Sequence, residues 1–300
     1  MFNFKSDIQF INYFRLFNFV SLILILISVG FIFYKGLNFG VDFKGGTLIE
    51  LRVENTEIGI GDVRQSFIKM NLGDVNVKKF GKGNDYLIKF EQTDKNKENF
   101  IENIKTQLSK NLASNFSFRR VENVGPKVSG ELLKSGLIAI VLSLSAMLIY
   151  IWIRFEWQFS LGAIIALIHD VIITIGFFSI LEFEINLSIV AAVLTIVGYS
   201  MNDTVVIFDR VRENLKKYSS KSINEISNLS INETLSRTII TSLTTLLALL
   251  SIFFFGGKIL HGFSFAMILG VIFGTYSSIF IANPILIKLK VNQKSVLKGE

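Results

Sequence analysis

Several residue types are scarce in this chain, and their scarcity excludes whole classes of function. The sequence contains no cysteine, so it forms no disulfide, and this absence does not indicate a cellular compartment. It contains no G-x-x-x-x-G-K-[ST] segment, which excludes nucleotide hydrolysis by a P-loop. It also contains neither a His/Cys cluster with metal-ligand spacing nor a G-x-S-x-G segment. We therefore expect no enzymatic activity, no metal and no cofactor.

Charge is also scarce for a chain of this length. Asp, Glu, Lys and Arg make up 18% of the 300 residues, whereas 50% are hydrophobic and the mean hydropathy is +0.50. Soluble domains are rarely so apolar over such a length, so the composition indicates an integral membrane protein. The net charge of +7 does not indicate a nucleic-acid partner, because the basic residues fall mostly in short segments beside apolar runs.

Six apolar runs are long enough to cross a bilayer, which requires about 20 residues per helix. After a short lead at 1–15, we expect a first helix at 16–34, an outer domain with its linker at 35–132, five helices within 133–289 and a tail at 290–300. The expected helices are Leu16–Tyr34, Leu133–Ile153, Phe159–Ile180, Leu187–Phe208, Thr238–Gly256 and Gly262–Leu289.

Lysine and arginine predict the orientation of these helices. If the N-terminus is cytoplasmic, the short outer loops hold only Lys258, and the long outer domain does not count because such domains are translocated regardless of charge. Both termini are therefore expected in the cytoplasm, and residues 35–132 on the outer side of the membrane. The basic residues of the inner segments are Lys5, Arg15, Arg154, Arg210, Arg212, Lys216, Lys217, Lys221, Lys288, Lys290, Lys294 and Lys298.

The outer domain has a readable pattern of strands and helices. Alternating apolar and polar residues predict half-buried strands, and apolar residues spaced by three and four predict helices. The resulting order, β-α-β-β-α-β, is that of the ferredoxin-like α+β fold. The expected strands are Thr47–Glu54, Asp74–Phe80, Asp85–Gln92 and Phe116–Val124, with a turn at Gly81–Asn84 and helices at Gly61–Asn71 and Asn96–Leu112. Pro126 suits the first turn of a helix that continues into the second span.

Asp203 is the most informative residue, because it lies inside the fourth apolar run. A carboxylate near the centre of a membrane helix costs about 2.5–3.5 kcal/mol on insertion scales, and such residues mark ion and substrate pathways. Thr195, Tyr199 and Asn202 share its helix face.

A matching polar face lies on the fifth run, which is antiparallel to the fourth. It contains Arg237, Thr241, Thr244 and Thr245. Arg237 is expected at a similar depth to Asp203, and pairing with an arginine is the cheapest way to keep that carboxylate in lipid. The alternative is that the pair is structural and only fixes helix register, and that the threonines bond to the backbone one turn earlier.

Two further features lie in the remaining runs. His169 and Asp170 fall near the middle of the third run and are candidates for the same pathway as Asp203, or else form a satisfied buried pair without a transport role. Small residues in the last run should let another helix, internal or from a partner, approach closely. They are Ala266, Gly270, Gly274 and Ser278.

Five segments of the chain are distinctive in combination: GLNFGVDFKGGTLIE, VGPKVSGELLKSG, ALIHDVIITIGFFS, VGYSMNDTVVIFDRVRENL and NETLSRTIITSLTT. Together they resemble the SecD/SecF family of protein-export membrane proteins, within the resistance-nodulation-division superfamily. The resemblance implies a proton-driven accessory subunit that acts late in export, with a SecD partner, the SecYEG channel and the translocating polypeptide. It implies that Asp203 and Arg237 are central to proton conduction, with Thr241 nearby.

Two other functions remain open at this stage. A half-sized exporter of small molecules or lipids from the same superfamily would share Asp203 but should carry an apolar ligand pocket in its outer domain. A purely structural assembly factor would tolerate the change of Asp203 to asparagine. The sequence does not distinguish protons from sodium as the coupling ion.

One half of such a transporter, taken alone, is expected to leave the face of Asp203 open to lipid. We therefore expect a partner of matching topology that covers it.

Overall fold

The computed structural model describes residues 8–55, 57–80, 83–91, 97–112 and 114–293. It forms two compact units, which we call the membrane unit (Met1–Asn38 and Leu137–Glu300) and the sheet unit (Phe39–Gly136). Parts of our expectations lie outside the described residues: segment 1–7 of the lead, the turn residues Gly81 and Lys82, the ends of a strand and a helix at Gln92 and Asn96, and the tail from residue 294.

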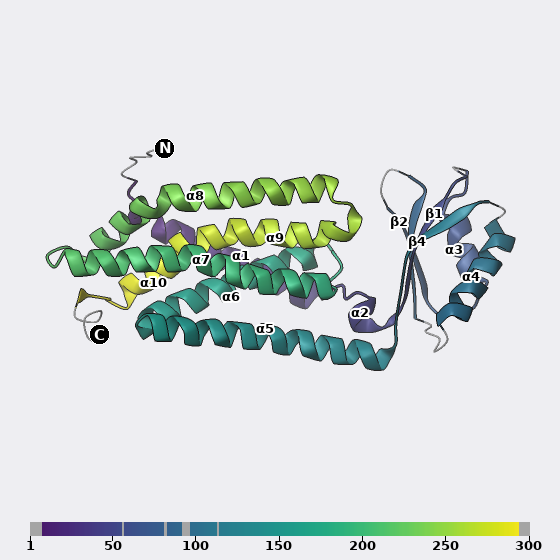
Figure 1. The fold of residues 1–300 in the computed structure, drawn as a ribbon, viewed down its shortest axis with the longest axis horizontal. Helices are drawn as coiled ribbons and strands as arrows, with labels where there is room; N and C mark the ends of the chain where they lie inside the picture. Colours follow the sequence, from purple (N-terminus) through teal and green to yellow (C-terminus); the bar gives the residue numbers. More distant parts are fainter. Residues whose placement is uncertain (1–7, 56, 81–82, 92–96, 113, 294–300) are drawn as a thin grey trace. The chain divides into compact units, whose positions relative to one another are not determined.

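Six helices are long and apolar enough to cross a membrane, which confirms the expected number of spans within the described residues. α6, α7 and α9 contain the largest share of buried residues, whereas few residues of α1 and α5 are buried. The elements that include these spans are α1 (Ile11–Lys35), α5 (Pro126–Arg154), α6 (Trp157–Ile180), α7 (Leu187–Lys217), α8 (Ile223–Phe255), α9 (Lys258–Ser277), η1 (Ser278–Ala282) and α10 (Asn283–Lys288) (Figure 1).

Three helices extend beyond the apolar runs that predict them. α5 begins at Pro126, as its position after the last strand predicts. α7 continues past Phe208 to Lys217, and α8 begins at Ile223 rather than near Thr238. The start of α8 is fixed by a capping box, in which Ser222 Oγ accepts from Glu225 N and Glu225 Oε2 accepts from Ser222 N. Hydropathy alone misses these polar helical turns.

The last span is interrupted by a π-helical turn, η1, between α9 and α10. A π turn shifts the backbone hydrogen-bond pattern, and such turns often lie at functional sites. Asn283 Nδ2 donates to Ser278 O at 2.8 Å, and Asn283 Oδ1 accepts from Ser227 Oγ of α8 at 3.2 Å. The irregular turn is therefore linked to the neighbouring helix.

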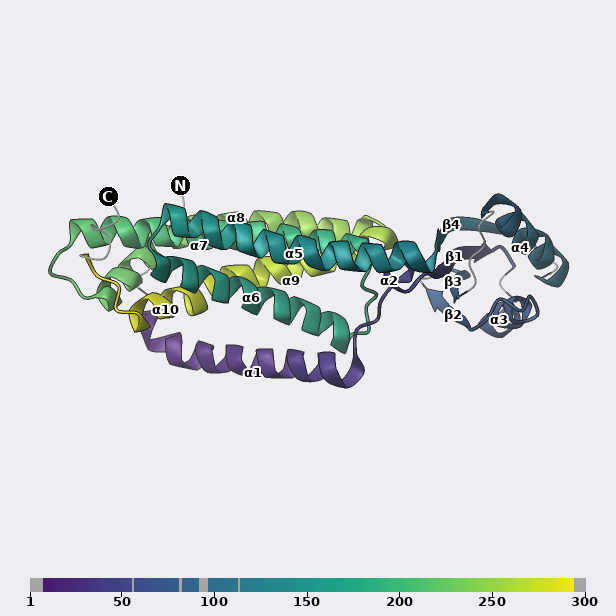
Figure 2. The same cartoon turned by 90° about the horizontal axis from the view of Figure 1, so that it is seen from below.

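Helices α6, α7 and α9 form the centre of the membrane unit. α9 packs between α7 and α8, and α1 lies against the outer side of α6 (Figures 1 and 2). The largest buried apolar cluster joins side chains of α6, α7, α8, η1 and α10. Polar side chains enclosed by these helices are thereby held in fixed positions.

The sheet unit has the expected ferredoxin-like topology. Its four strands are antiparallel in the order β2-β3-β1-β4, with β1 and β3 at the centre. The apolar face of the sheet packs with residues of α3 and α4 in one core. The elements are α2 (Val41–Lys44), which the sequence did not predict, β1 (Gly46–Val53), α3 (Ile60–Ile68), β2 (Val75–Phe80), β3 (Asp85–Phe90), α4 (Lys97–Leu112) and β4 (Phe116–Val124).

Candidate functional site

Asp203 lies on the buried face of α7, where α8 and α9 enclose it. Its side chain is nearly inaccessible, with 3% of the residue's surface exposed. Its Oδ2 atom accepts from Thr275 Oγ1 of α9 at 3.2 Å and from Ser242 Oγ of α8 at 3.4 Å. The two hydroxyl oxygens are 2.6 Å apart. The expectation that Asp203 would face lipid without a partner is therefore wrong, because helices of the same chain cover it.

We expected Arg237 and Asp203 to approach within salt-bridge or single-water distance, and the structure contains no direct ion pair between them. No ion pair of the described residues joins the two side chains, and Arg237 is exposed on the surface of α8. The reason is depth: Ser242 is the residue of α8 level with Asp203, and Arg237 lies more than one helical turn nearer Glu233.

Thr241 is held by the backbone rather than by Asp203. Its hydroxyl donates to Arg237 O at 3.1 Å and to Thr238 O at 3.0 Å, which is the local bonding usual for threonine in membrane helices. Its carbonyl accepts from Tyr199 Oη of α7 at 3.3 Å. The structure thus brings Thr241 to the seam between α7 and α8, while its hydroxyl stays on α8.

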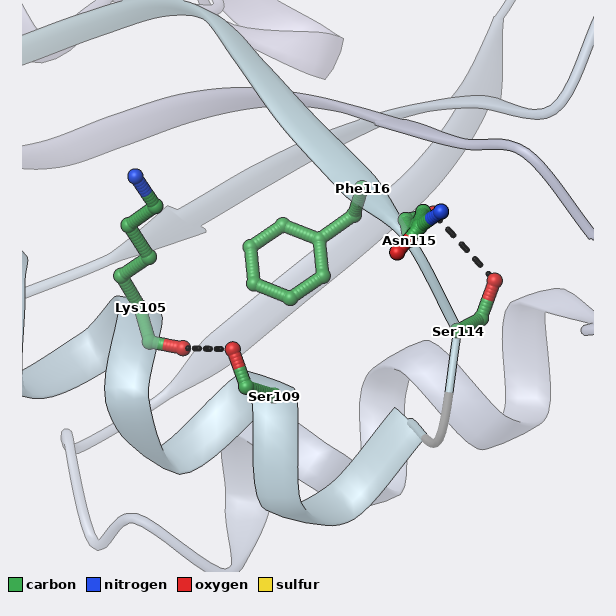
Figure 3. A pocket seen from close by; sticks show the side chains of 5 residues that line it. All are labelled: Lys105, Ser109, Ser114, Asn115 and Phe116. Carbon is green, nitrogen blue, oxygen red and sulfur yellow. Dashed lines mark hydrogen bonds between the residues drawn. The ribbon is translucent and has the colours of Figure 1, made fainter.

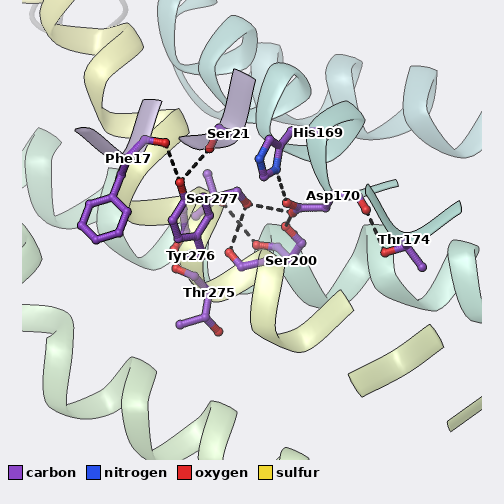
Figure 4. Close-up of polar contacts among 12 residues, drawn as sticks. Phe17, Ser21, His169, Asp170, Thr174, Ser200, Thr275, Tyr276 and Ser277 are labelled. Atoms are coloured by element: carbon purple, nitrogen blue, oxygen red, sulfur yellow. Dashed lines mark hydrogen bonds and ion pairs between the residues drawn. The ribbon is translucent and has the colours of Figure 1, made fainter. Parts of the chain in front are cut away.

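His169 and Asp170 of α6 form a second buried polar cluster (Figure 4). His169 Nδ1 lies 2.9 Å from Asp170 Oδ1. Asp170 Oδ2 accepts from Ser200 Oγ of α7 at 2.6 Å and from Ser277 Oγ of α9 at 2.8 Å. The ring of Tyr276 stacks on the imidazole of His169 at 5.9 Å between centroids. This cluster ties three helices together.

The small-residue face of α9 packs inside this chain, against α7. A Cβ atom added at Gly274 would lie 2.9 Å from Ser200 Cβ, and one added at Gly270 would lie 2.3 Å from Ile196 Cγ1. Glycine at these positions permits a close approach of the two helices. That approach brings Ser200 and Ser277 to the same carboxylate.

The hydroxyl partners of both carboxylates were missed by sequence reasoning. Ser242, Thr275, Ser200 and Ser277 each bond to a carboxylate of another helix. Serine and threonine in membrane helices usually bond to their own backbone, so their type alone gives no signal. The helix-face pattern of buried hydroxyls would have been the only sign.

Outside these two clusters, the described residues offer little for a ligand. No three His, Cys, Asp or Glu side chains among them come together so as to hold a metal ion. The sheet unit has an open pocket of about 510 Å³ between α4 and β4, lined by Lys105, Ser109, Ser114, Asn115 and Phe116 (Figure 3). The hydroxyls of Ser109 and Ser114 bond to neighbouring backbone carbonyls, so we assign no ligand to it.

Comparison with known proteins places these features in a family. Residues 104–292, more than half of the chain, match the model of the protein export membrane protein SecD/SecF, C-terminal region. A protein translocase subunit SecF of Rickettsia bellii is 49% identical over 94% of this chain and 93% of its own length, and that of Rickettsia prowazekii is 46% identical over 99% and 96%. The chain belongs to the SecD/SecF family.

Solved structures agree with this membership. A crystal structure of SecDF from Thermus thermophilus, described as a translocon-associated membrane protein, matches with a TM-score of 0.86 and 33% identity. SecDF in a super-membrane-facing form matches with a TM-score of 0.71. Each match covers 97% of this chain but only 40% of the SecDF chain, so this chain spans less than half the length of those proteins.

The SecD/SecF family also has a short GG motif, which matches residues 30–57 here. Its two glycines, Gly45 and Gly46, join α2 to β1 with φ angles of 77° and 111°, which side-chain-bearing residues rarely adopt. A Cβ atom at Gly46 would lie 2.6 Å from Phe90 O of β3. The motif is thus required by backbone geometry in the sheet unit.

Proposed function

We propose that this chain is an accessory subunit of the Sec protein translocase, driven by the proton-motive force and acting late in export across the bacterial inner membrane. Family membership and the names of its relatives support the translocase assignment. The single observation that supports proton coupling is Asp203, a carboxylate buried among membrane helices with two hydroxyl donors beside it. In this proposal both termini are cytoplasmic and residues 35–132 are periplasmic, as the lysine and arginine distribution favours.

The proposed mechanism begins with Asp203 ionised and held by the hydroxyls of Ser242 and Thr275. A proton from the outer side neutralises the carboxylate, which weakens both hydroxyl bonds because hydrogen bonds to a charged acceptor are the stronger ones. Helices α7, α8 and α9 then move relative to one another, which makes the site a two-state element. Each proton that crosses the membrane potential supplies about 2.3 kcal/mol per 100 mV, enough to bias such an equilibrium.

In this proposal Arg237 and Thr241 line the proton pathway beside Asp203. For His169 and Asp170 the geometry supports the structural alternative. Asp170 is fully enclosed and bonded to three side chains, so we propose that the pair positions α7 and α9 around the pathway.

We also propose a partner of the SecD type. Asn202 of α7 and Arg237 of α8 are exposed on the surface of the membrane unit, where contact with lipid is expensive. A membrane span of a partner would cover them, and the SecDF chains, of which this chain covers only 40%, contain further sequence that could supply such a span. The SecYEG channel and the translocating polypeptide complete the proposed assembly. Co-purification from native membranes without overproduction should yield a SecD-type subunit, and its absence would contradict the proposed assembly.

The test of proton coupling is the change of Asp203 to asparagine, which has the same shape but cannot ionise. Inverted membrane vesicles supplied with ATP should export a precursor protein at a rate that no longer responds to the proton-motive force. Asp209→Asn, on the exposed end of the same helix, is the matched control and should keep the response. Full stimulation in the Asp203→Asn vesicles would refute the role of Asp203 as proton carrier.

A further inference from the structure

A row of hydroxyl side chains runs along the inner face of α8, separate from the polar face that contains Arg237 and Thr241. Its members recur every three or four residues, the spacing of one helix face. None is more than 8% exposed. They are Ser227, Ser230, Thr234, Thr238 and Ser242. We call them the inner hydroxyl row.

The hydroxyls of this row differ in how they are bonded. Thr234 donates to Ser230 O at 2.9 Å, the usual local bond. Ser242 instead reaches Asp203 and a hydroxyl of α9. Thr238 Oγ1 is buried, with 2% of the residue exposed, and makes no hydrogen bond to any residue that the structure describes. Buried hydroxyls in native proteins are nearly always satisfied, commonly by an ordered water.

The spacing of the row fits water between neighbouring hydroxyls. Thr234, Thr238 and Ser242 follow each other at intervals of four residues, and four residues of α-helix rise about 6 Å. Two hydrogen bonds of about 2.8 Å in sequence span nearly the same distance. One water between each pair of hydroxyls would therefore connect them.

Two members of the row lie near ionisable groups. Ser242, at one end, contacts Asp203. Ser230, next to the other end at Ser227, accepts at Oγ from Asn214 Nδ2 at 3.0 Å, and the same nitrogen donates to Glu233 Oε2 at 2.7 Å. The side chain of Glu233 is 29% exposed, so this end reaches solvent.

We propose that the inner hydroxyl row holds a chain of waters that carries protons between Asp203 and Glu233, with the hydroxyl of Thr238 at the middle of the chain. The inference rests on the proposed function, in which the Glu233 end is cytoplasmic. The proton on Asp203 Oδ2 passes to Ser242 Oγ while the hydroxyl proton of Ser242 passes to the adjacent water. Each later step breaks one O–H bond as it forms the next. The amide of Asn214 only donates and does not relay a proton, so a last water takes the proton from Ser230 Oγ to the solvent beside Glu233, and Asp203 is left ionised.

The first experiment removes the hydroxyl of Thr238 without changing its shape. Thr238→Val, in the full complex with its partner subunit, should slow proton flux across proteoliposomes by on the order of tenfold or more, measured with a trapped pH-sensitive dye. Thr238→Ser should restore the flux, which a purely packing role would not predict. Thr244→Val is the matched control, because Thr244 is exposed on the same helix and bonds only to its own backbone. Wild-type flux in Thr238→Val would overturn the proposal.

The second experiment detects the water directly and uses the absence of cysteine from the chain. In inverted vesicles, hydrogen peroxide, a neutral oxidant little larger than water, should oxidise Thr238→Cys faster than Leu249→Cys, a buried apolar position on the same helix. Equal rates would overturn the water path. Proton flux in Asp203→Asn vesicles, measured in parallel, distinguishes a failure of the proposed function from a failure of the water path. Flux that persists in Asp203→Asn refutes the proposed function, whereas flux lost in Asp203→Asn but intact in Thr238→Val refutes only the path.

Discussion

The two buried carboxylates of the membrane unit are held in different ways. Asp170 is fully enclosed and has three side-chain partners at 2.6–2.9 Å. Asp203 is 3% exposed and has two hydroxyl partners at 3.2 and 3.4 Å, long for bonds from a hydroxyl to oxygen. Both receive one of their hydroxyls from α9, through Ser277 and Thr275 respectively. The two sites therefore share α7 and α9 but differ in the length of their hydrogen bonds.

This difference in hydrogen bonding separates a structural carboxylate, Asp170, from a carboxylate that exchanges a proton, Asp203. Short bonds from α7 and α9 to Asp170 fix these helices against α6, and any change of protonation there would disturb three partners at once. The longer bonds to Asp203 are cheaper to break, and its two hydroxyls can bond to each other at 2.6 Å when the carboxylate no longer accepts from them. A residue that gains and loses a proton in every cycle needs the second kind of surroundings.

The comparison predicts its largest effect for Asp170→Leu. The substitution leaves Ser200, Ser277 and His169 buried without their common acceptor, and breaking a buried pair in this way costs about 3–5 kcal/mol of unfolding free energy. Thermal unfolding of the purified protein in detergent should show a large loss of stability. Asp203→Leu is the matched variant and should lose much less. Equal losses in the two variants would contradict the distinction between the sites.

How far the sequence predicts these sites depends on the type of residue. Asp203 and Asp170 stand out because a carboxylate inside an apolar run is costly, and such residues are rare unless they are paired or functional. Their hydroxyl partners do not stand out, since serine and threonine are common in membrane helices and bond to the backbone. The long-range pairing of Ser242 and Thr275 with Asp203 depends on how α8 and α9 slide along α7. That register is set by packing, for example at Gly274 against Ser200.

The same limit accounts for the errors in depth and in helix length. The expected depth of Arg237 assumed that Asp209 of α7 and Glu233 of α8 lie at one level. Glu233 instead bonds to Arg210 and Asn214, further along α7 than Asp209, so Ser242 and not Arg237 is level with Asp203. The polar start of α8 is invisible to hydropathy, yet the capping box Ser222–Glu225 is present in the sequence as a helix signal. The ferredoxin-like order, in contrast, follows from strand and helix periodicity alone.

The smallest effect, and the sharpest test of the comparison, comes from removing one hydroxyl at each site. Ser200→Ala removes a 2.6 Å bond to an enclosed acceptor, and we expect a loss of about 1–3 kcal/mol in unfolding free energy. Ser242→Ala removes a 3.4 Å bond, and Thr275 still donates to Asp203, so the stability of this variant should change less.

The effect on export should be larger for Ser242→Ala than for Ser200→Ala. At a temperature where both variants are folded, Ser200→Ala should retain stimulation by the proton-motive force, whereas Ser242→Ala should lose much of it. Thermal unfolding and vesicle export on the same preparations measure both quantities. If the variant that loses more stability also loses more stimulated export, the two carboxylates do not have separate structural and proton-exchange roles.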